Sequence, residues 1–343
     1  EQTMRHQPMK WIAKSPEAIK NGCRSFWINA FTSPWKPWKE IVREFLESKD
    51  DPEKLKTVYN TLFGQLWEER AAVDEDTIVS RAEEYEAELP DGVLCLTCGV
   101  DTQDDRLEYE VVGYGFYEEN WGIEKGIIQG KPSDEETWIK LEGIINRTWH
   151  YKDGKTLRIS LTFIDSGGHY TQDVREKCAF RQRSGMRIFP IEGSNRPDTP
   201  FTAPPIKRDY EISGRAGKVW AYRIGVDAGK EHIYSGLKVE KEGARRSHFP
   251  SNLGRGYDAL FYSGLLSERM TYKNGKWVWD KLPGHERNEA LDCRNYANAA
   301  FRVVHPNMDY LKSKLLGLET PNEKEPKRKL KKQRRRSDYG DYI

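Results

Sequence analysis

Three short segments, far apart in the chain, each end an apolar run on an aspartate. The segments are residues 94–101, 161–165 and 288–292, and the aspartates are Asp101, Asp165 and Asp292. The first two segments have the pattern of buried strands, and the third has the pattern of the start of an apolar helix. A carboxylate that closes a core strand is costly to desolvate unless it is paired or bound to a metal. Brought together, the three would form an oxygen-rich site for a hard divalent cation.

Each aspartate also has a simpler explanation. A single aspartate at a strand end is more often a turn or capping residue than a ligand, although Asp101 would lie where a central strand leaves the sheet. Asp165 is followed by Gly167 and Gly168, which permit close approach of a backbone or a phosphate. Asp292 could belong to a solvated helix face, but its apolar neighbours place this turn near the core. The individual signals are weak, and their combination predicts a site.

Two further side chains are secondary candidates. Glu289 lies about one helical turn before Asp292, so both carboxylates can share one face of the helix. His169 follows Asp165 closely. It could act as a general base or as an acid for the leaving group, and it could equally be an ordinary loop histidine.

Carboxylates from separate elements are what a two-metal phosphodiesterase requires. Such an enzyme holds two cations about 3.5–4 Å apart, so that one activates a water molecule and the other stabilises the leaving oxygen. The constellation therefore favours metal-dependent cleavage of phosphodiesters.

From residue 93 onward, the expected elements alternate between strands and helices. Strands are predicted at 93–100, 107–116 and 121–128, a helix at 133–149, a strand at 157–164, a helix at 171–183 and a strand at 187–191. A proline-containing stretch at 197–205 predicts a surface loop. It is followed by a strand at 220–226, a hairpin at 270–282 turned by Asn274-Gly275, and a helix at 285–304.

Residues 1–90 have a helical pattern and contain five of the eleven tryptophans. Helices are predicted near 38–46, 55–62 and 79–89. So short a segment cannot bury this aromatic layer by itself, so we expect it to pack on the following domain or on one upstream. The chain begins with Glu1 rather than Met, and we expect it to be a fragment of a longer protein.

The composition predicts a folded protein with a separate basic tail. A hydrophobic fraction of 37% with 12% aromatics is sufficient for a core, and no apolar run approaches the ~18 residues of a membrane span. The five cysteines are odd in number and scattered, which favours a reducing compartment. The net charge is +2, and subtracting the eight basic residues of 327–336 leaves 2 − 8 = −6 for the rest.

Such a block of charge is typical of a disordered arm that binds nucleic acid or an acidic partner, although a merely solubilising tail is about equally common. The residues are Lys327, Arg328, Lys329, Lys331, Lys332, Arg334, Arg335 and Arg336.

Three other patterns do not predict sites. Cys95 and Cys98 are half of a zinc motif, but positions three apart on a strand face opposite sides of the sheet. Asp227 repeats the Gly-Val-Asp tripeptide that ends at Asp101, yet a helical stretch follows it, which favours a helix N-cap. The phosphate-loop spacing G-x-x-x-x-G-K-[ST] is absent, so no ATPase site is expected in this chain.

Three local signatures resemble the lambda-like class of bacteriophage terminase large subunits, in particular their ribonuclease H-like nuclease domain. The first, residues 25–30 with 33–35, is similar to the segment that links motor to nuclease in that class. The second is residues 99–103, at the start of the nuclease. The third and most specific is residues 288–293 with Tyr296-Ala297. The resemblance covers roughly residues 20 to 305.

The resemblance implies a ribonuclease H-like α/β fold, with a mixed central sheet flanked by helices, at residues 91–310. A helical linker or end of the motor region would occupy 1–90, and the basic tail 311–343. It also implies a metal-dependent endonuclease that cuts double-stranded viral DNA during packaging. Asp101 would bridge two Mg²⁺ or Mn²⁺ ions, and Asp165 and Asp292 would each hold one.

The partners implied by this resemblance are double-stranded DNA, the terminase small subunit, the portal protein and an upstream ATPase motor, in the host cytoplasm.

Two alternatives to this function remain. One is a ribonuclease H-like transposase or resolvase, disfavoured by the tryptophan-rich linker and by the lack of a DNA-reading motif. The other is a non-catalytic packaging adaptor that docks the portal or the motor.

Overall fold

The structure is a computed structural model that describes residues 26–49, 51–65, 73–194, 196, 199–273, 276–285 and 287–318. The basic segment 327–336 and the Asn274-Gly275 turn lie outside these residues, so the expectations for them stay predictions. In the described part of the chain, no helix combines the length and apolar character needed to cross a membrane.

An eight-stranded mixed sheet forms the centre of the molecule, in the order β10-β3-β2-β1-β6-β7-β9-β8. Strands β1, β6, β7 and β9 run parallel, and β2 is antiparallel to both β1 and β3. A three-stranded meander followed by parallel crossovers is the ribonuclease H-like arrangement, so the expected fold class is confirmed. The strands are β1 (Cys95–Thr102), β2 (Arg106–Tyr114), β3 (Asn120–Gln129), β6 (Ile159–Asp165), β7 (Ile188–Ser194), β8 (Ile206–Ile212), β9 (Arg215–Gly225) and β10 (Ser247–His248).

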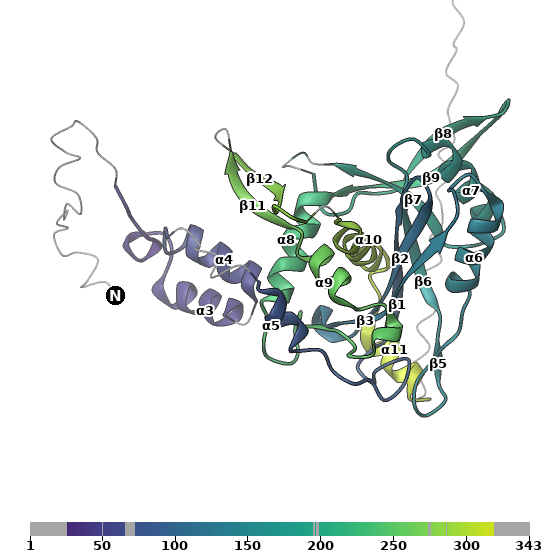
Figure 1. Ribbon diagram of the computed structural model, residues 1–343. Coiled ribbons are helices and arrows are strands. Elements are labelled where there is room, and N and C mark those ends of the chain that lie inside the picture. The colour runs from purple at the N-terminus through teal and green to yellow at the C-terminus, as the bar shows by residue number, and fades with distance from the viewer. Residues whose placement is uncertain are drawn as a thin grey trace, which may run out of the picture.

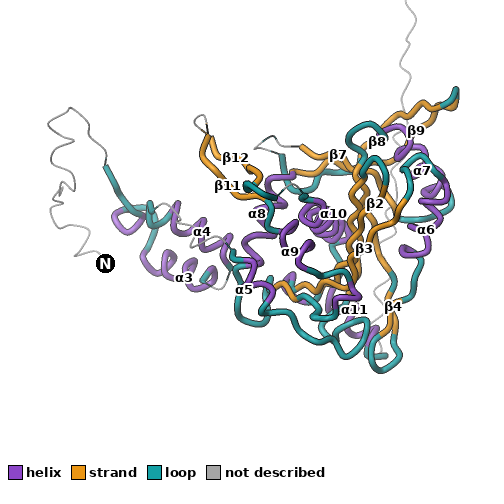
Figure 2. Tube along the Cα trace, viewed as in Figure 1, coloured by secondary structure: helices purple, strands orange, loops and turns teal. Residues whose placement is uncertain are grey.

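Helices cover both faces of this sheet (Figure 1, Figure 2). On one face lie α6 (Glu135–Ile145) and α7 (Thr171–Arg183), and over the other lie α8 (Val226–Leu237), α9 (Ala259–Leu265) and α10 (Glu289–Val304). The helix predicted at 171–183 is confirmed at both ends. The helix predicted at 133–149 ends at Ile145, because the chain then forms β4 (Trp149–His150), which pairs with β5 (Thr156–Leu157).

Two further predictions concern the C-terminal part of the chain. The hairpin predicted at 270–282 consists of β11 (Glu268–Lys273) and β12 (Lys276–Lys281). Residues 311–315, which the prediction assigns to the tail, belong instead to α11 (Met308–Leu315). Met308 and Leu311 pack against a cluster that includes Phe301, and this packing explains why the helix extends.

The N-terminal helical pair, α3 (Trp38–Ser48) and α4 (Pro52–Thr61), has a small core of its own. The side chains in it are Ile41, Val58 and Leu62, with Phe31, Trp38, Phe45 and Phe63 packed against them. The aromatic side chains of the pair stay partly exposed and Trp35 is 89% exposed, so the expectation that this layer packs on another domain stays a prediction.

The third helix predicted in this region is wrong. Only α5 (Glu75–Val79) is helical, and residues 81–89 follow an irregular path. There the amide of Glu83 donates to the carbonyl of Phe249, and the amide of Leu89 donates to the carbonyl of His150. These long-range hydrogen bonds replace the helical ones that the glutamate-rich composition favours.

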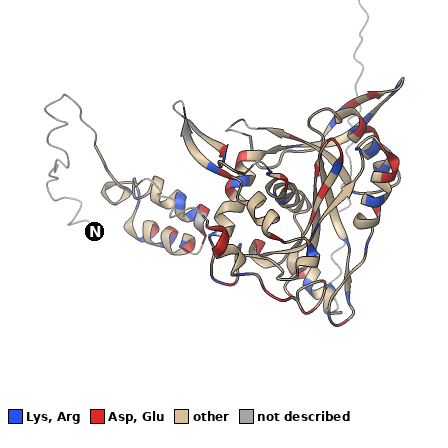
Figure 3. Ribbon diagram, viewed as in Figure 1, with Lys and Arg blue, Asp and Glu red and all other residues tan. Residues whose placement is uncertain are grey.

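Arg245 joins the helical pair to the rest of the molecule. Its buried guanidinium donates to Asp51 Oδ1 at 3.1 Å and to Glu53 Oε1 at 3.2 Å. The same group donates to the hydroxyl of Ser235 in α8 and contacts the ring of His232. These contacts hold the start of α4 beside α8. Figure 3 shows that acidic and basic residues are interspersed along the α3–α4 pair and along α6 and α7.

Candidate active site

Alternate residues of β1 face opposite sides of the sheet. The even-numbered residues from Leu96 to Val100 belong to the core under α6 and α7. The odd-numbered residues face α10, where Thr97 Oγ1 donates a hydrogen bond to the carbonyl of Ala297 at 2.8 Å. Asp101 continues this row, and it is only 5% exposed.

Asp165 lies at the neighbouring position of the same sheet edge. Strands β1 and β6 are parallel, with Val100 opposite Ile164, so both aspartates stand at the carboxyl ends of their strands. The hydroxyl of Thr102 donates to the backbone carbonyl of Asp165 at 2.8 Å, which ties the two ends together.

Helix α10 passes close enough to β1 to bring Asp292 to this edge. A Cβ at Gly99 would lie 2.0 Å from the carbonyl oxygen of Cys293, so only glycine permits this approach. Asp292 lies in the first turn of α10. Tyr296, one turn further on, packs with residues of β6, so this face of the helix is directed at the strand that ends in Asp165.

Burial and mutual repulsion make these carboxylates costly to ionise. Burial, followed by the negative charge of Asp292, raises the pKa of Asp101 to about 8, with Asp165 and Glu289 adding to the effect and a hydrogen bond from Gln103 opposing it. Asp292, Asp165 and Glu289 therefore lie close enough to Asp101 for their charges to act on it.

The other two aspartates are affected in the same direction. Burial raises the pKa of Asp292 to about 7, against the positive charge of Lys230. Burial also raises the pKa of Asp165, opposed by the backbone amides of residues 166–167. Burial raises the pKa of Tyr296 well above its usual range, and the charges of all three aspartates contribute. The charges of the three aspartates therefore all act on this one phenol.

The chemistry of this donor set fits a divalent cation, since hard oxygen donors that repel one another are stabilised by a positive ion. Side-chain amides hold two of these aspartates. Gln103 Nε2 donates a hydrogen bond to Asp101 Oδ2, and Asn288 Nδ2 donates one to Asp292 Oδ2 at 2.9 Å. Among the described residues, no three His, Cys, Asp or Glu side chains are grouped so as to hold a metal ion.

The secondary candidates have other contacts. Glu289 is buried and forms an ion pair with Arg106 at 2.9 Å, and Arg287 Nε lies 3.4 Å from it. The His169 side chain is 90% exposed, and its Nδ1 lies 3.7 Å from Asp104 in the turn after β1. Glu289 therefore lies next to the aspartates but is paired with two arginines. His169 lies at the surface.

Sequence reasoning missed a buried ion pair beside Asp292. Lys230 of α8 and Glu268 of β11 are 7% and 5% exposed, and Lys230 Nζ lies 2.6 Å from Glu268 Oε2. The only local signal was a lysine that follows Gly229 in an apolar helix. No sequence pattern connects that lysine with Glu268, 38 residues later.

Two look-alike motifs are separated from the site. Cys95 packs with Phe301 under α10, and Cys98 packs on the opposite face of β1, so the predicted separation of the cysteine pair is confirmed. Asp227 is not the N-cap of its helix. Gly225 has that position, and Asp227 lies in the first turn.

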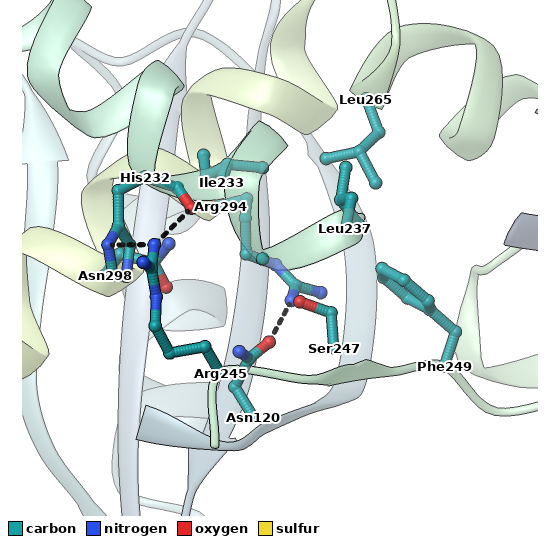
Figure 4. A pocket seen from close by; sticks show the side chains of 11 residues that line it. Asn120, His232, Ile233, Leu237, Arg245, Ser247, Phe249, Leu265, Arg294 and Asn298 are labelled. Atoms are coloured by element: carbon teal, nitrogen blue, oxygen red, sulfur yellow. Dashed lines mark hydrogen bonds between the residues drawn. The ribbon is translucent and has the colours of Figure 1, made fainter. Parts of the chain in front are cut away.

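A small cavity lies on another side of α10. It is lined by residues that include Asn120, Arg245, Arg294 and Asn298, and its volume of about 10 Å³ matches about one water molecule (Figure 4). Arg294 donates to Asn120 Oδ1 at 3.0 Å there. This space is too small for a substrate, so it does not compete with the aspartates as a candidate site.

A ribonuclease H-like sheet with acidic side chains at the ends of two parallel strands and at the start of a helix is an arrangement expected of a nuclease. Residues 23–312 match the family model described as "Terminase large subunit gpA, endonuclease domain". The chain belongs to this family.

Two curated relatives carry the name "Terminase, large subunit". The protein of Escherichia phage lambda is 34% identical over 304 residues, which cover 85% of this chain and 46% of that protein. The protein of Enterobacteria phage P21 is 31% identical over 290 residues, 81% of this chain and 44% of that protein. The chain thus spans less than half the length of these relatives.

Solved structures of low similarity include two terminase nucleases. The large terminase nuclease from thermophilic phage G20c has a TM-score of 0.34 at 12% identity, covering 67% of this chain and 98% of that one. A mutant nuclease domain of the large terminase subunit gp2 of bacterial virus Sf6, with manganese and beta-thujaplicinol, has a TM-score of 0.37 at 12% identity, covering 69% and 99%.

Proposed function

We propose that this chain is a metal-dependent endonuclease domain that cuts double-stranded DNA during packaging of a viral genome. The observation that carries the proposal is the position of Asp101 and Asp165 at the carboxyl ends of adjacent parallel strands, with Asp292 in the first turn of a helix that packs closely on β1. Membership of the endonuclease-domain family supports the chemistry. The names of the phage relatives support genome packaging as its setting.

The three aspartates would hold Mg²⁺ or Mn²⁺, and we propose two ions. When bound, such ions activate a water molecule and stabilise the leaving oxygen of the phosphodiester. The chain prepares the site in two ways. The amide of Gly167 donates to Asp165 Oδ1 at 3.1 Å and so orients this carboxylate. The close contact of α10 with β1 keeps water from Asp101, and a drier site strengthens electrostatic interactions.

The proposal extends to partners. A terminase large subunit would meet double-stranded DNA as substrate, and the terminase small subunit, the portal protein and an ATPase motor as assembly partners. We assign the basic segment 327–336 to contacts with nucleic acid or with one of these partners, because eight positive charges in ten residues attract polyanions.

Nicking of supercoiled plasmid by the full chain, with and without Mn²⁺, tests the function. The wild type should nick only with the metal, and Asp101→Asn should show no activity. Asp209→Asn is the matched control, since Asp209 is an exposed aspartate on β8 that pairs with Lys218. Activity of Asp101→Asn with Mn²⁺ would overturn the site assignment. A wild-type protein that does not nick the plasmid with Mn²⁺ would favour the alternative of a non-catalytic packaging adaptor.

A further inference from the structure

Lys230 is a buried cation beside the aspartate site whose charge the proposed mechanism does not use. Its ammonium group contacts Glu268 at 2.6 Å, and both residues are more than nine-tenths buried. Burying such a pair is costly unless the remaining hydrogen-bonding atoms also find partners. The second oxygen of Glu268 has such a partner, and that partner leads directly to the site.

Asn288 connects this pair to Asp292. Its Nδ2 atom donates to Glu268 Oε1 at 3.1 Å and to Asp292 Oδ2 at 2.9 Å. Asn288 is the N-cap residue of α10, a position where an asparagine side chain usually accepts a backbone N–H. Here it makes no such capping bond, because its amide is directed at the two carboxylates. The result is a continuous chain of contacts, Lys230–Glu268–Asn288–Asp292.

Close packing fixes the position of Lys230. A Cβ at the preceding Gly229 would lie 1.7 Å from the buried Oδ1 of Asn295 in α10. The amide of Asn295 in turn donates to the carbonyl of Val226, at the start of α8, at 3.2 Å. Helix α8 therefore rests on α10 with little freedom. The backbone carbonyl of Glu268 is held as well, since it accepts a hydrogen bond from the hydroxyl of Tyr234.

The charges around Asp292 are unequally screened. Lys230 and Lys281 are the positive groups that act on it, and Glu268 and Asp165 are the negative ones. Lys281 is exposed, so water screens its charge. Lys230 is buried, and its charge acts through a medium of lower dielectric constant.

We propose that Lys230 is a positioning residue of the nuclease, which orients Asp292 for metal binding through Glu268 and Asn288. The inference rests on the proposed function. Without the ammonium group, Glu268 becomes an unpaired buried carboxylate next to Asp292, and Asn288 loses its fixed acceptor. Groups that orient metal ligands in this way typically change metal affinity by about 10- to 100-fold when they are removed.

Mn²⁺ binding to the full chain, measured by electron paramagnetic resonance titration, is the primary test. Lys230→Met removes the charge and keeps the length of the stem, and we expect the dissociation constant for Mn²⁺ to rise about 10-fold or more. Lys230→Arg keeps the charge and should restore binding to within about 3-fold of wild type. Lys218→Met, which breaks the exposed pair with Asp209, is the control and should bind as wild type.

Plasmid nicking separates positioning from a general loss of structure. In Lys230→Met the Mn²⁺ concentration for half-maximal nicking should rise, while the rate at saturating Mn²⁺ falls by a smaller factor. A purely structural role predicts a lower melting temperature with unchanged Mn²⁺ affinity, and that result overturns the proposal. Should Lys230→Met not fold, Lys230→Met with Glu268→Gln leaves no unpaired buried charge. It should fold and still bind Mn²⁺ more weakly than wild type.

If the double variant of Lys230 and Glu268 binds Mn²⁺ as tightly as the wild type, the proposal about Lys230 is also overturned. The two proposals fail differently. If the wild type neither nicks DNA nor binds Mn²⁺, the function itself is wrong, and Lys230 has no such role. If the wild type nicks, Asp101→Asn does not, and Lys230→Met binds Mn²⁺ normally, only the inference about Lys230 is wrong.

Discussion

Asp101→Asn should stabilise the metal-free protein, and by more at higher pH. Burial and the neighbouring carboxylates raise the pKa of Asp101 from 3.8 to about 8. Between these values the unfolded chain has lost the proton that the folded chain retains. Because the unfolded state binds fewer protons, the free energy of unfolding falls as pH rises through this window. Asparagine has nearly the same shape and no charge, so it removes this dependence.

The size of the effect follows from the pKa. At about 1.4 kcal/mol for each pH unit between 3.8 and 7, the carboxyl of Asp101 opposes folding by at most about 4 kcal/mol at pH 7. Entry of water and movement of the neighbouring carboxylates reduce this penalty. We therefore expect Asp101→Asn to raise the free energy of unfolding by about 1–3 kcal/mol at pH 7, and by somewhat more at pH 8.

Urea unfolding in EDTA at pH 5, 6, 7 and 8 measures this directly. The difference between Asp101→Asn and wild type should widen steadily with pH. Asp209→Asn removes an exposed carboxylate that pairs with Lys218 and should show no such widening. A difference that does not change with pH, or a variant less stable than wild type at pH 8, would refute the reasoning about a buried, mutually repelling cluster.

Two predictions concern the packing around the site. Gly99→Ala would place a methyl group 2.0 Å from the carbonyl of Cys293, and should cost about 2–4 kcal/mol in urea unfolding. Gly143→Ala in α6, where a Cβ meets open space, should instead be neutral or stabilising. Arg245→Met removes the hydrogen bonds to the acidic side chains at the start of α4. It should speed tryptic cleavage of the α3–α4 pair, and unchanged cleavage kinetics would contradict that linking role.

Local patterns sufficed for the elements that carry the aspartates. The apolar runs before Asp101 and Asp165 are buried on both faces of the sheet, so their sequences show strands without reference to the rest of the chain. Strand β8 (Ile206–Ile212) was not predicted, because it is an edge strand in which three successive charged residues, 207–209, interrupt the apolar alternation. Its backbone is held from outside the sheet, by Arg175 and Gln172 of α7, and no local pattern reveals such contacts.

Local patterns were insufficient for the groups that surround the aspartates. Asn288 was predicted near the start of a helix, and it is the N-cap residue of α10. Its side chain, however, donates hydrogen bonds to two carboxylates and does not cap the backbone. Glu289 looked like a possible ligand, and only the fold shows that Arg106 and Arg287 contact it. These assignments depend on residues that are distant in sequence, so they require the tertiary structure.

The cost of burying the aspartates and their capacity to bind a cation have the same physical origin. Gly99 lets α10 approach β1, and this contact removes water from the carboxylate of Asp101. A desolvated carboxylate among other acids is destabilised until a positive charge arrives. The closer the packing, the larger the free energy that a divalent ion can recover. At Asp292, in our proposal, the ion pair of Lys230 with Glu268 holds Asn288, and through it the carboxylate, in one orientation, so an arriving ion meets a ligand that is already oriented.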